Sequence, residues 1–448
     1  MASCATLADE VRDARQHTLG LVEDLTDEQL VGPRLPTVNP MLWEIGHVAW
    51  FQERWVLRHA AGRAPLRSDG DALYDSSAVP HDTRWDLPLP SRAETLQYLA
   101  TVRDEVLTLL GHSMPDALEY FVRLSVFHED MHNEAFTITR QTLGYAAPKI
   151  RYASAQPESG VIAAGDAKIP GGSFPLGADA GEPFVFDNEK WAHRVEVLPF
   201  SIARTAVTQG EFAAFVDDGG YERRALWDDQ GWRWRCQAAA RLPVYWKREG
   251  GGYLRRHFDE WLSVEPSLPM LHVSWFEAQA YCRWAGRRLP SEIEWEVAAA
   301  GEPDERGQRL TDRKRRYPWG DSASDSLAVS LSDSLAGVDT RARLDWTGMR
   351  CGGVHELAAG DSAFGCRQMI GNVWEWTSAD FLPYPGFVAD PYRDYSQPWF
   401  GTHKVLRGGC FATRARLLRN TWRNFYPPDR RDVFAGFRTC ALDERDRP

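Results

Sequence analysis

Residues 269–301 read PMLHVSWFEAQAYCRWAGRRLPSEIEWEVAAAG, and this stretch decides the fold of the second part of the chain. It contains Ser274 followed three residues later by Glu277, and the same spacing recurs at Ser291 and Glu294. The spacing is typical of a capping box, in which the two side chains hydrogen-bond to backbone N–H groups at the start of a helix. The stretch therefore predicts two consecutive helices.

The sequence around these two helices has the character of short strands and long loops. Gly, Pro and Trp are frequent there, and short apolar segments such as HRVEVLPFSIA (193–203) and KVLRGGCF (404–411) lie between them. The chain has 19 Trp residues, which fit either a core filled by indole rings or an aromatic pocket. We expect a loop-rich α+β domain.

The first 145 residues read instead as helices. Apolar residues recur at helical spacing, and Ser91 with Glu94 forms a further capping box. A segment without clear periodicity, residues 146–165, is expected to link two domains, 1–150 and 151–448. The predicted helices form a four-helix bundle with one long connection (61–90), and they cover residues 5–24, 40–60, 91–111 and 115–144.

Composition and charge restrict the class of protein. The net charge of −11 disfavours a nucleic-acid-binding role, because such binding needs cationic side chains to neutralise phosphates. We find no apolar run of about 18 residues, so no membrane span is expected, and the N-terminus lacks the pattern of a secretory signal. Seven cysteines without CxxC spacing indicate reduced thiols. We expect a cytoplasmic protein that binds neither nucleic acid nor membranes.

The segment HEDMHNEAF (128–136) places His128 and His132 four residues apart on one predicted helix. That spacing puts both side chains on one face, within reach of a single metal ion. His47 lies on another predicted helix and is expected to point into the same bundle. Three neutral imidazoles leave coordination positions open, which suits iron that binds O2 and a thiolate or selenolate. Each histidine taken alone is more typical of an ordinary core or surface residue than of a ligand, and Glu134 fits either a partner of a ligand or a solvent-facing position.

The whole chain resembles the ergothioneine-type sulfoxide synthases, which pair a DinB-like helical bundle with a formylglycine-generating-enzyme-like (C-type-lectin-like) domain. The resemblance implies that His47, His128 and His132 are ligands of Fe(II), that O2 is a co-substrate, and that the second domain completes the substrate pocket. The motifs that carry it are GHVAWFQE (46–53), HEDMH (128–132), IPGGSFPLG (169–177), MIGNVWEWT (369–377), VLRGGC (405–410) and FAGFRTC (434–440).

The resemblance of the second domain to formylglycine-generating enzymes raises a rival chemistry. Those enzymes use a close pair of cysteines to hold copper, whereas Cys410 is followed by FATRARLLRNTW, which contains no second cysteine. We therefore disfavour cysteine-based oxidation. A thiol dioxygenase and a metal-free small-molecule-binding module remain alternatives.

The family implies hercynine, a trimethylated histidine, as the substrate. Aromatic faces attract its quaternary ammonium group, and Asn or Arg side chains suit its carboxylate. The segment WRNFYPPDRRDVFAGFR (422–438) offers both kinds; a surface run of arginines is the alternative, which the neighbouring aromatic residues in an acidic protein disfavour. Its candidate substrate-binding residues are Asn424, Phe425, Tyr426, Arg430 and Arg431.

Two positions depart from the family members that use γ-glutamylcysteine. Met131 stands where those members have Gln, and Tyr426 stands where they have an Asp that matches the ammonium group of the donor. The chain therefore looks closest to the selenoneine synthase branch, which takes a selenosugar; cysteine, γ-glutamylcysteine or another thiol is the alternative donor. Arg84 falls in the loop where relatives place donor-binding arginines, although a solvated loop position fits it as well.

By the same resemblance, a tyrosine supplies a proton or an electron during turnover. Tyr384, Tyr392 and Tyr395, in the segment LPYPGFVADPYRDY (382–395), are the candidates, and we favour Tyr392. Each of them equally fits a phenol that packs a loop. The predicted reaction is the joining of selenium or sulfur to the imidazole C2 of hercynine, with oxygenation of the chalcogen.

Overall fold

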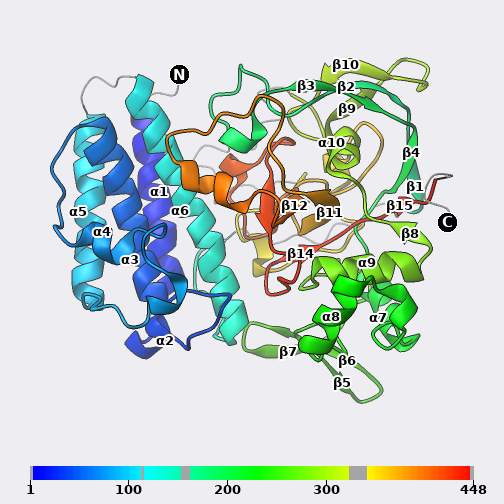
Figure 1. The fold of residues 1–448 in the computed structure, drawn as a ribbon, viewed down its shortest axis with the longest axis horizontal. Helices are drawn as coiled ribbons and strands as arrows, with labels where there is room; N and C mark the ends of the chain where they lie inside the picture. Colours follow the sequence, from blue (N-terminus) through cyan, green and yellow to red (C-terminus); the bar gives the residue numbers. More distant parts are fainter. Residues whose placement is uncertain (1–3, 112–115, 153–161, 322–340, 444–448) are drawn as a thin grey trace. The chain divides into compact units, whose positions relative to one another are not determined.

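The structure is a computed structural model that describes residues 4–111, 116–152, 162–321 and 341–443 (Figure 1). The described chain divides into two compact units, one reaching Arg151 and the other starting at Tyr152. The first unit is helical and the second mixes short strands with helices and loops, which confirms the predicted α+β class. None of the helices among these residues is both long enough and apolar enough to cross a membrane.

The four long helices of the first unit match the four predicted ones. The helix expected over residues 40–60 is an α-helix that continues directly as a π-helix, η1. Helix α1 packs against α6, and α3 packs against both α5 and α6. The helices of this unit are α1 (Cys4–Val22), α2 (Asp27–Val31), α3 (Met41–Gln52), η1 (Glu53–Ala60), α4 (Gly70–Tyr74), η2 (His81–Thr83), α5 (Arg92–Leu110) and α6 (Asp116–Leu143).

A buried ion pair joins α1 to α6 inside the bundle. Nε of Arg15 lies 2.8 Å from Oε1 of Glu129, and each side chain is 1% exposed. Thr18 donates a hydrogen bond to the same carboxylate, and Arg15 also donates to Gln52 on α3. Because a buried charge is tolerated only with its partners in place, this cluster sets how α1, α3 and α6 lie along one another.

The helices of the second unit include the two that residues 269–301 predict. The hydroxyls of Ser274 and Ser291 accept hydrogen bonds from the backbone N–H groups of Glu277 and Glu294, both at 3.2 Å, as capping boxes require. Two further helices were not predicted. The α-helices of this unit are α7 (Gln209–Asp217), α8 (Asp229–Gln237), α9 (Trp275–Trp284) and α10 (Glu292–Ala300).

The strands of the second unit are short and form several small sheets. One four-stranded sheet has the order β1-β4-β15-β8 and another has the order β13-β12-β11-β14, in which β11 and β14 are parallel. The remaining sheets are the pairs β2-β3 and β9-β10 and the three strands β5-β6-β7. The strands are β1 (Asp166–Ile169), β2 (Gly172–Leu176), β3 (His193–Val197), β4 (Phe200–Ala203), β5 (Trp246–Glu249), β6 (Gly252–His257), β7 (Glu260–Ser263), β8 (Arg287–Arg288), β9 (Gly301–Pro303), β10 (Leu310–Lys314), β11 (Trp374–Asp380), β12 (Lys404–Arg407), β13 (Asn424–Tyr426), β14 (Ala435–Gly436) and β15 (Cys440–Ala441).

Indole rings fill much of the core of the second unit. Trp295, Trp346, Trp374 and Trp376 are all less than 2% exposed. Since the indole N–H needs a partner when buried, Trp295 donates to Oε2 of Glu375 at 2.8 Å.

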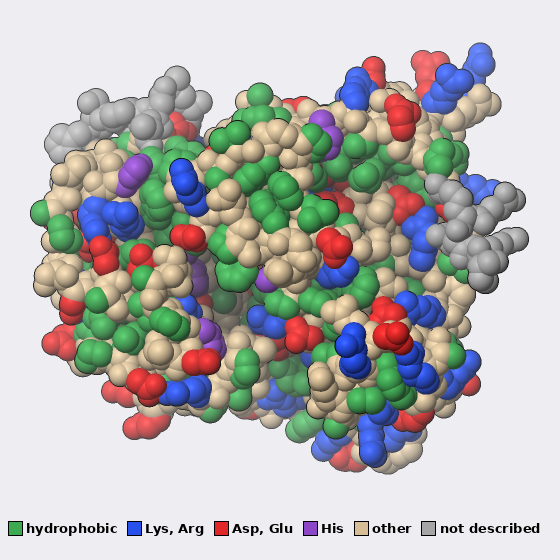
Figure 2. Space-filling model, in the orientation of Figure 1, with side chains coloured by type: hydrophobic (Ala, Val, Ile, Leu, Met, Phe, Trp, Pro, Cys, Tyr) green, Lys and Arg blue, Asp and Glu red, His purple; other side chains and the backbone are tan. Residues whose placement is uncertain are grey.

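All six cysteines whose side chains the structure describes are free thiols. On the face drawn in Figure 2, basic and acidic side chains are interspersed.

Candidate metal centre

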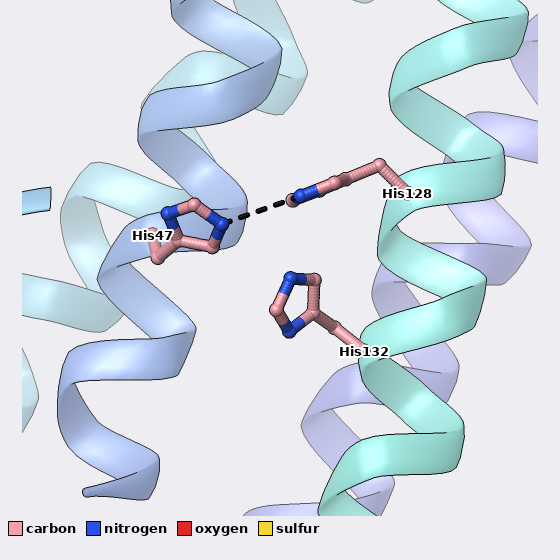
Figure 3. A group of neighbouring side chains, drawn as sticks. All are labelled: His47, His128 and His132. Carbon is pink, nitrogen blue, oxygen red and sulfur yellow. Dashed lines mark hydrogen bonds between the residues drawn. The ribbon is translucent and has the colours of Figure 1, made fainter. Parts of the chain in front are cut away.

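Three histidines from two helices converge inside the first unit. His47 comes from α3, and His128 and His132 come from α6 one turn apart (Figure 3). One ring nitrogen from each lies within 4.8 Å of the other two. The Nε2 atoms of His47 and His128 are 3.3 Å apart. The structure thus brings together the three residues predicted to bind a metal.

Hydrogen bonds at the far side of two rings decide which nitrogen faces the centre. Nδ1 of His47 lies 2.8 Å from the carbonyl oxygen of Tyr74, and Nδ1 of His132 lies 2.5 Å from Oε1 of Glu44. A carbonyl or carboxylate oxygen only accepts, so each Nδ1 carries the proton. Nε2 of both rings is therefore available as a ligand.

Burial keeps two of the rings neutral. Loss of water lowers the pKa of His47 and of His128 well below the usual value, and the neighbouring His132 lowers both further. The ring of Phe51 stacks on His128 with centroids 3.5 Å apart, and Trp43 stacks on His47 at 4.9 Å. An apolar wall thus surrounds ligands that are uncharged at neutral pH, the form in which imidazole binds metals.

These residues fit a divalent transition metal. Nitrogen ligands about 2.1 Å from one ion lie roughly 3–3.5 Å apart, which matches the separation of the two closest Nε2 atoms. Among the described residues the group has three members, His47, His128 and His132. Three protein ligands are typical of catalytic metal sites, because positions remain for reactants.

Glu44 is the residue of this centre that sequence reasoning missed. Glu134 was the acidic residue considered beside the ligands, but Glu44 holds His132. Glu44 lies three residues before His47 on α3, so the two share a helix face. That spacing alone would predict a contact between Glu44 and His47. It does not predict the observed contact with His132 on α6.

Arg84 and Met131 also lie in the first unit. The guanidinium carbon of Arg84 is 3.9 Å from the ring centroid of Trp43, the indole that stacks on His47. Arg84 is 9% exposed and donates to Oδ1 of Asn39 at 2.7 Å and to the carbonyl oxygen of Val79 at 3.2 Å. Met131 is half-buried on α6. Donor binding by these two residues remains a prediction.

In the second unit, Asn424, Phe425 and Tyr426 form strand β13 and are half-buried. The ring of Phe425 stacks on Phe381, with centroids 4.0 Å apart, and lies steeply inclined to the ring of Tyr395, with centroids 5.9 Å apart. Oδ1 of Asn424 accepts a hydrogen bond from the backbone N–H of Phe425 at 2.8 Å. The structure thus places an amide beside a group of aromatic rings.

The two candidate arginines already have acidic partners. Arg430 binds both carboxylate oxygens of Asp432 at 2.7 Å and lies over the ring of Tyr426 at 5.2 Å. Arg431 lies 3.3 Å from Oε1 of Glu277. Sequence reasoning could not show the second ion pair, because Glu277 is 154 residues away from Arg431 along the chain.

The three candidate tyrosines have different surroundings. Tyr384 is in the core, where its hydroxyl lies 3.4 Å from Oε1 of Glu292. The Tyr395 hydroxyl accepts a hydrogen bond from Nε1 of Trp422 at 3.3 Å, and the Tyr392 ring lies 6.2 Å from the Tyr395 ring. Burial raises the pKa of both Tyr384 and Tyr395. Tyr395 also contacts the ring of Phe425, so the rings of Tyr392, Tyr395 and Phe425 lie in one aromatic group.

Comparisons with known proteins cover both units. A family model described as the DinB superfamily matches residues 10–138, and one described as the Sulfatase-modifying factor enzyme 1-like domain matches residues 154–442. A hercynine oxygenase of Mycolicibacterium thermoresistibile is 40% identical over 443 residues, which cover 97% of this chain and 94% of that protein. The hercynine oxygenase of Mycobacterium tuberculosis is 38% identical, with 98% and 99% covered.

Formylglycine-generating enzymes are similar over a smaller part. The enzyme of Thermomonospora curvata is 32% identical over 306 residues, which cover 63% of this chain and 94% of that enzyme. The hercynine oxygenases, by contrast, match nearly the whole length of both proteins. This difference confirms the resemblance found in the sequence motifs. The chain belongs to the hercynine oxygenase family.

Proposed function

We propose that this chain is an O2-dependent non-haem iron enzyme that forms a C–Se or C–S bond at the imidazole C2 of hercynine and oxygenates the chalcogen. The observation that carries the proposal is the group of three histidine ligands, His47, His128 and His132, in a member of the hercynine oxygenase family. Membership of that family makes the chain an oxygenase. The identity of the metal and of the donor is the finer part of the proposal.

The three histidines would hold Fe(II) through Nε2 of His47 and His132 and through a ring nitrogen of His128. When bound, the ion supplies O2 activation and a site for a soft chalcogen anion. The Tyr74 carbonyl and the Glu44 carboxylate keep the protons of His47 and His132 on Nδ1. The stacked rings of Phe51 and Trp43 keep water away from the ligands.

Hercynine has a quaternary ammonium group and a carboxylate that need different partners. We assign the ammonium group to the aromatic faces of Phe425 and Tyr395. The amide of Asn424 then suits the carboxylate. Arg430 and Arg431 would first have to leave Asp432 and Glu277, so Asn424 is the more direct partner.

We assign proton transfer during turnover to Oη of Tyr392. Tyr384 lies in the core among charged groups, and burial raises the pKa of both the Tyr384 and Tyr395 hydroxyls. Tyr392 is half-buried at the start of the turn Arg393–Tyr395. Tyr392→Phe should therefore lower kcat with little effect on the KM of hercynine, whereas Tyr395→Phe should preserve most of kcat.

A selenosugar is the proposed donor. Met131 and Tyr426 are uncharged, and neither matches the ammonium group of a γ-glutamyl donor. The test supplies hercynine and O2 with a selenosugar, its thio-analogue, cysteine or γ-glutamylcysteine, and compares kcat/KM. The highest value is expected for the selenosugar. A clear preference for γ-glutamylcysteine would contradict this assignment.

The metal centre is tested by anaerobic reconstitution. We expect about one Fe(II) per chain, and loss of both metal binding and turnover in His128→Ala and His132→Ala. His59→Ala is a matched control, since His59 is exposed on η1, the continuation of the helix that carries His47. Turnover retained in either of the first two variants would rule out the centre as the catalytic site.

A further inference from the structure

Glu44 is a buried carboxylate whose charge acts on the nearby Arg84 guanidinium, although Arg84 does not lie within ion-pair distance of it. Glu44 is 1% exposed, and its Oε1 accepts a hydrogen bond from Nδ1 of His132. Its other oxygen, Oε2, is buried and has no hydrogen-bond partner among the residues that the structure describes. In that same part of the chain, His132 is the one basic side chain within ion-pair distance. Because a buried carboxylate is costly without close compensation, a positive charge bound to its histidine partner would stabilise it beyond what the more distant Arg84 provides.

Two other buried carboxylates of the first unit, Glu129 and Glu53, have partners for both oxygens or for their charge within the protein. Glu129 is paired with Arg15 at 2.8 Å. Glu53, also 1% exposed, accepts hydrogen bonds from the Tyr98 hydroxyl at 2.5 Å and from the backbone N–H of Leu66 at 3.1 Å. Both oxygens of Glu53 are thus satisfied and Glu129 has an ion pair, whereas Glu44 has one hydrogen bond, to His132 of the histidine cluster, and an Oε2 without a partner among the described residues.

We infer that Glu44 is both the positioning residue of His132 and the counter-charge of the metal centre. A divalent ion brings two positive charges into a buried site, where the imidazoles of His47 and His128 contribute none. The Glu44 carboxylate compensates one of these charges through the ring of His132, and it makes the ring a stronger donor to the metal. This inference rests on the proposed metal centre.

The position of Glu44 also couples two helices. Glu44 and His47 lie three residues apart on α3, while His132 belongs to α6. Helix α3 therefore supplies one ligand and also orients a ligand of the facing helix. A change at Glu44 should alter the geometry of the metal site without removing any ligand.

Two substitutions separate the charge of Glu44 from its hydrogen bond. Glu44→Gln keeps an oxygen that accepts from Nδ1 of His132 and removes the charge, and Glu44→Ala removes both. Partners of this kind change metal affinity by roughly 10–100-fold. We expect binding of Fe(II) or Co(II), titrated anaerobically, to weaken about tenfold in Glu44→Gln and more in Glu44→Ala. The visible spectrum of the Co(II) form should also change in Glu44→Ala, because the ring is no longer held.

Glu53→Gln is the matched control. It alters an equally buried carboxylate on the same continuous helix, so it reports the general cost of losing a buried charge. Its metal affinity should stay within about twofold of the unsubstituted chain, even if its melting temperature falls. Affinity in Glu44→Gln equal to that of Glu53→Gln would overturn the counter-charge role, and an unchanged Co(II) spectrum in Glu44→Ala would overturn the positioning role.

This experiment can fail separately from the proposed function. Metal titration needs neither hercynine nor a chalcogen donor, so the Glu44 variants are informative whatever the reaction is. If the unsubstituted chain binds metal but does not convert hercynine, the proposed reaction is wrong and the inference on Glu44 stands. If hercynine is converted and Glu44→Ala binds metal as tightly as the unsubstituted chain, the inference on Glu44 is wrong and the reaction stands.

Discussion

The interior of the bundle depends on single charged side chains. Arg15→Met would leave Glu129 buried without its ion-pair partner and would also remove the donor to Gln52. Breaking a buried pair in this way typically costs about 3–5 kcal/mol. Urea denaturation should show that loss in the first unit. The double variant Arg15→Met with Glu129→Leu should recover part of it, and an equally unstable double variant would contradict the explanation.

His272 gives the second unit a pH-dependent stability. Burial first, and then nearby His257, lower its pKa to about 3 from the ordinary 6.5. Above pH 6.5 both folded and unfolded chains hold this ring neutral. As the pH falls from 6.5 towards 3, the unfolded chain takes up a proton that the folded chain refuses, so stability is lost at up to about 1.4 kcal/mol per pH unit.

His272→Leu should make this acid dependence shallower. The free energy of unfolding of the variant, measured from pH 7 to pH 4, should fall less steeply than that of the unsubstituted chain. The difference in slope corresponds to the uptake of up to one proton fewer on unfolding. The absolute stability at pH 7 is a separate matter, because the variant also loses the hydrogen bond from His272 to the Asp432 carbonyl. An unchanged slope would mean that other groups govern the acid transition.

The aromatic group around Phe425 gives a prediction for substrate binding. Phe425→Leu keeps much of the volume but removes the aromatic face proposed for the quaternary ammonium group. We expect the KM of hercynine to rise roughly tenfold, from a loss of about 1–2 kcal/mol. Phe425→Trp should bind at least as well. The KM of hercynine in both variants is measured by steady-state kinetics. An unchanged KM in Phe425→Leu would show that Phe425 does not bind hercynine.

At the scale of helices and strands, Gly46 shows how close α3 lies to α4. A Cβ atom at Gly46 would come 2.2 Å from Cε1 of Tyr74, the residue whose carbonyl holds His47. Gly46→Ala should therefore displace Tyr74 and weaken metal binding, although alanine favours helices. Gly181→Ala is the control, since nothing lies within 4 Å of its added atom. Metal titration of both variants decides the matter.

Local sequence signals predicted helices well and sheets poorly. The capping boxes at Ser274 and Ser291 mark true helix starts, and the same signal at Thr208 and Glu211 precedes α7 but was overlooked. Sheet order could not be predicted, because partner strands are distant in sequence. Strand β15, for example, pairs with β4 through Cys440 and Ile202. Helical spacing predicted the pair His128 and His132 and the family resemblance added His47, whereas neither signal indicated the contact of Glu44 with His132, which joins two helices.

At the scale of the whole molecule, the two units should unfold separately if each has its own core. Metal bound at the proposed centre would stabilise the first unit by about 2.7 kcal/mol when the free ion is 100-fold above Kd. Calorimetry of the metal-free chain should show a transition that moves to higher temperature when Fe(II) is added anaerobically. The remaining transition should stay in place, and neither should move in His132→Ala.

The two helices that carry the ligands are far apart in the chain. His47 and His128 are separated by 81 residues, and α4 and α5 lie between them. A shared ion would close this long loop much as a covalent cross-link does, and its loss would leave the negative charge of Glu44 inside the bundle. Iron supply would then govern the lifetime of the protein as well as its activity, because newly made chains without iron would open more often and be degraded sooner.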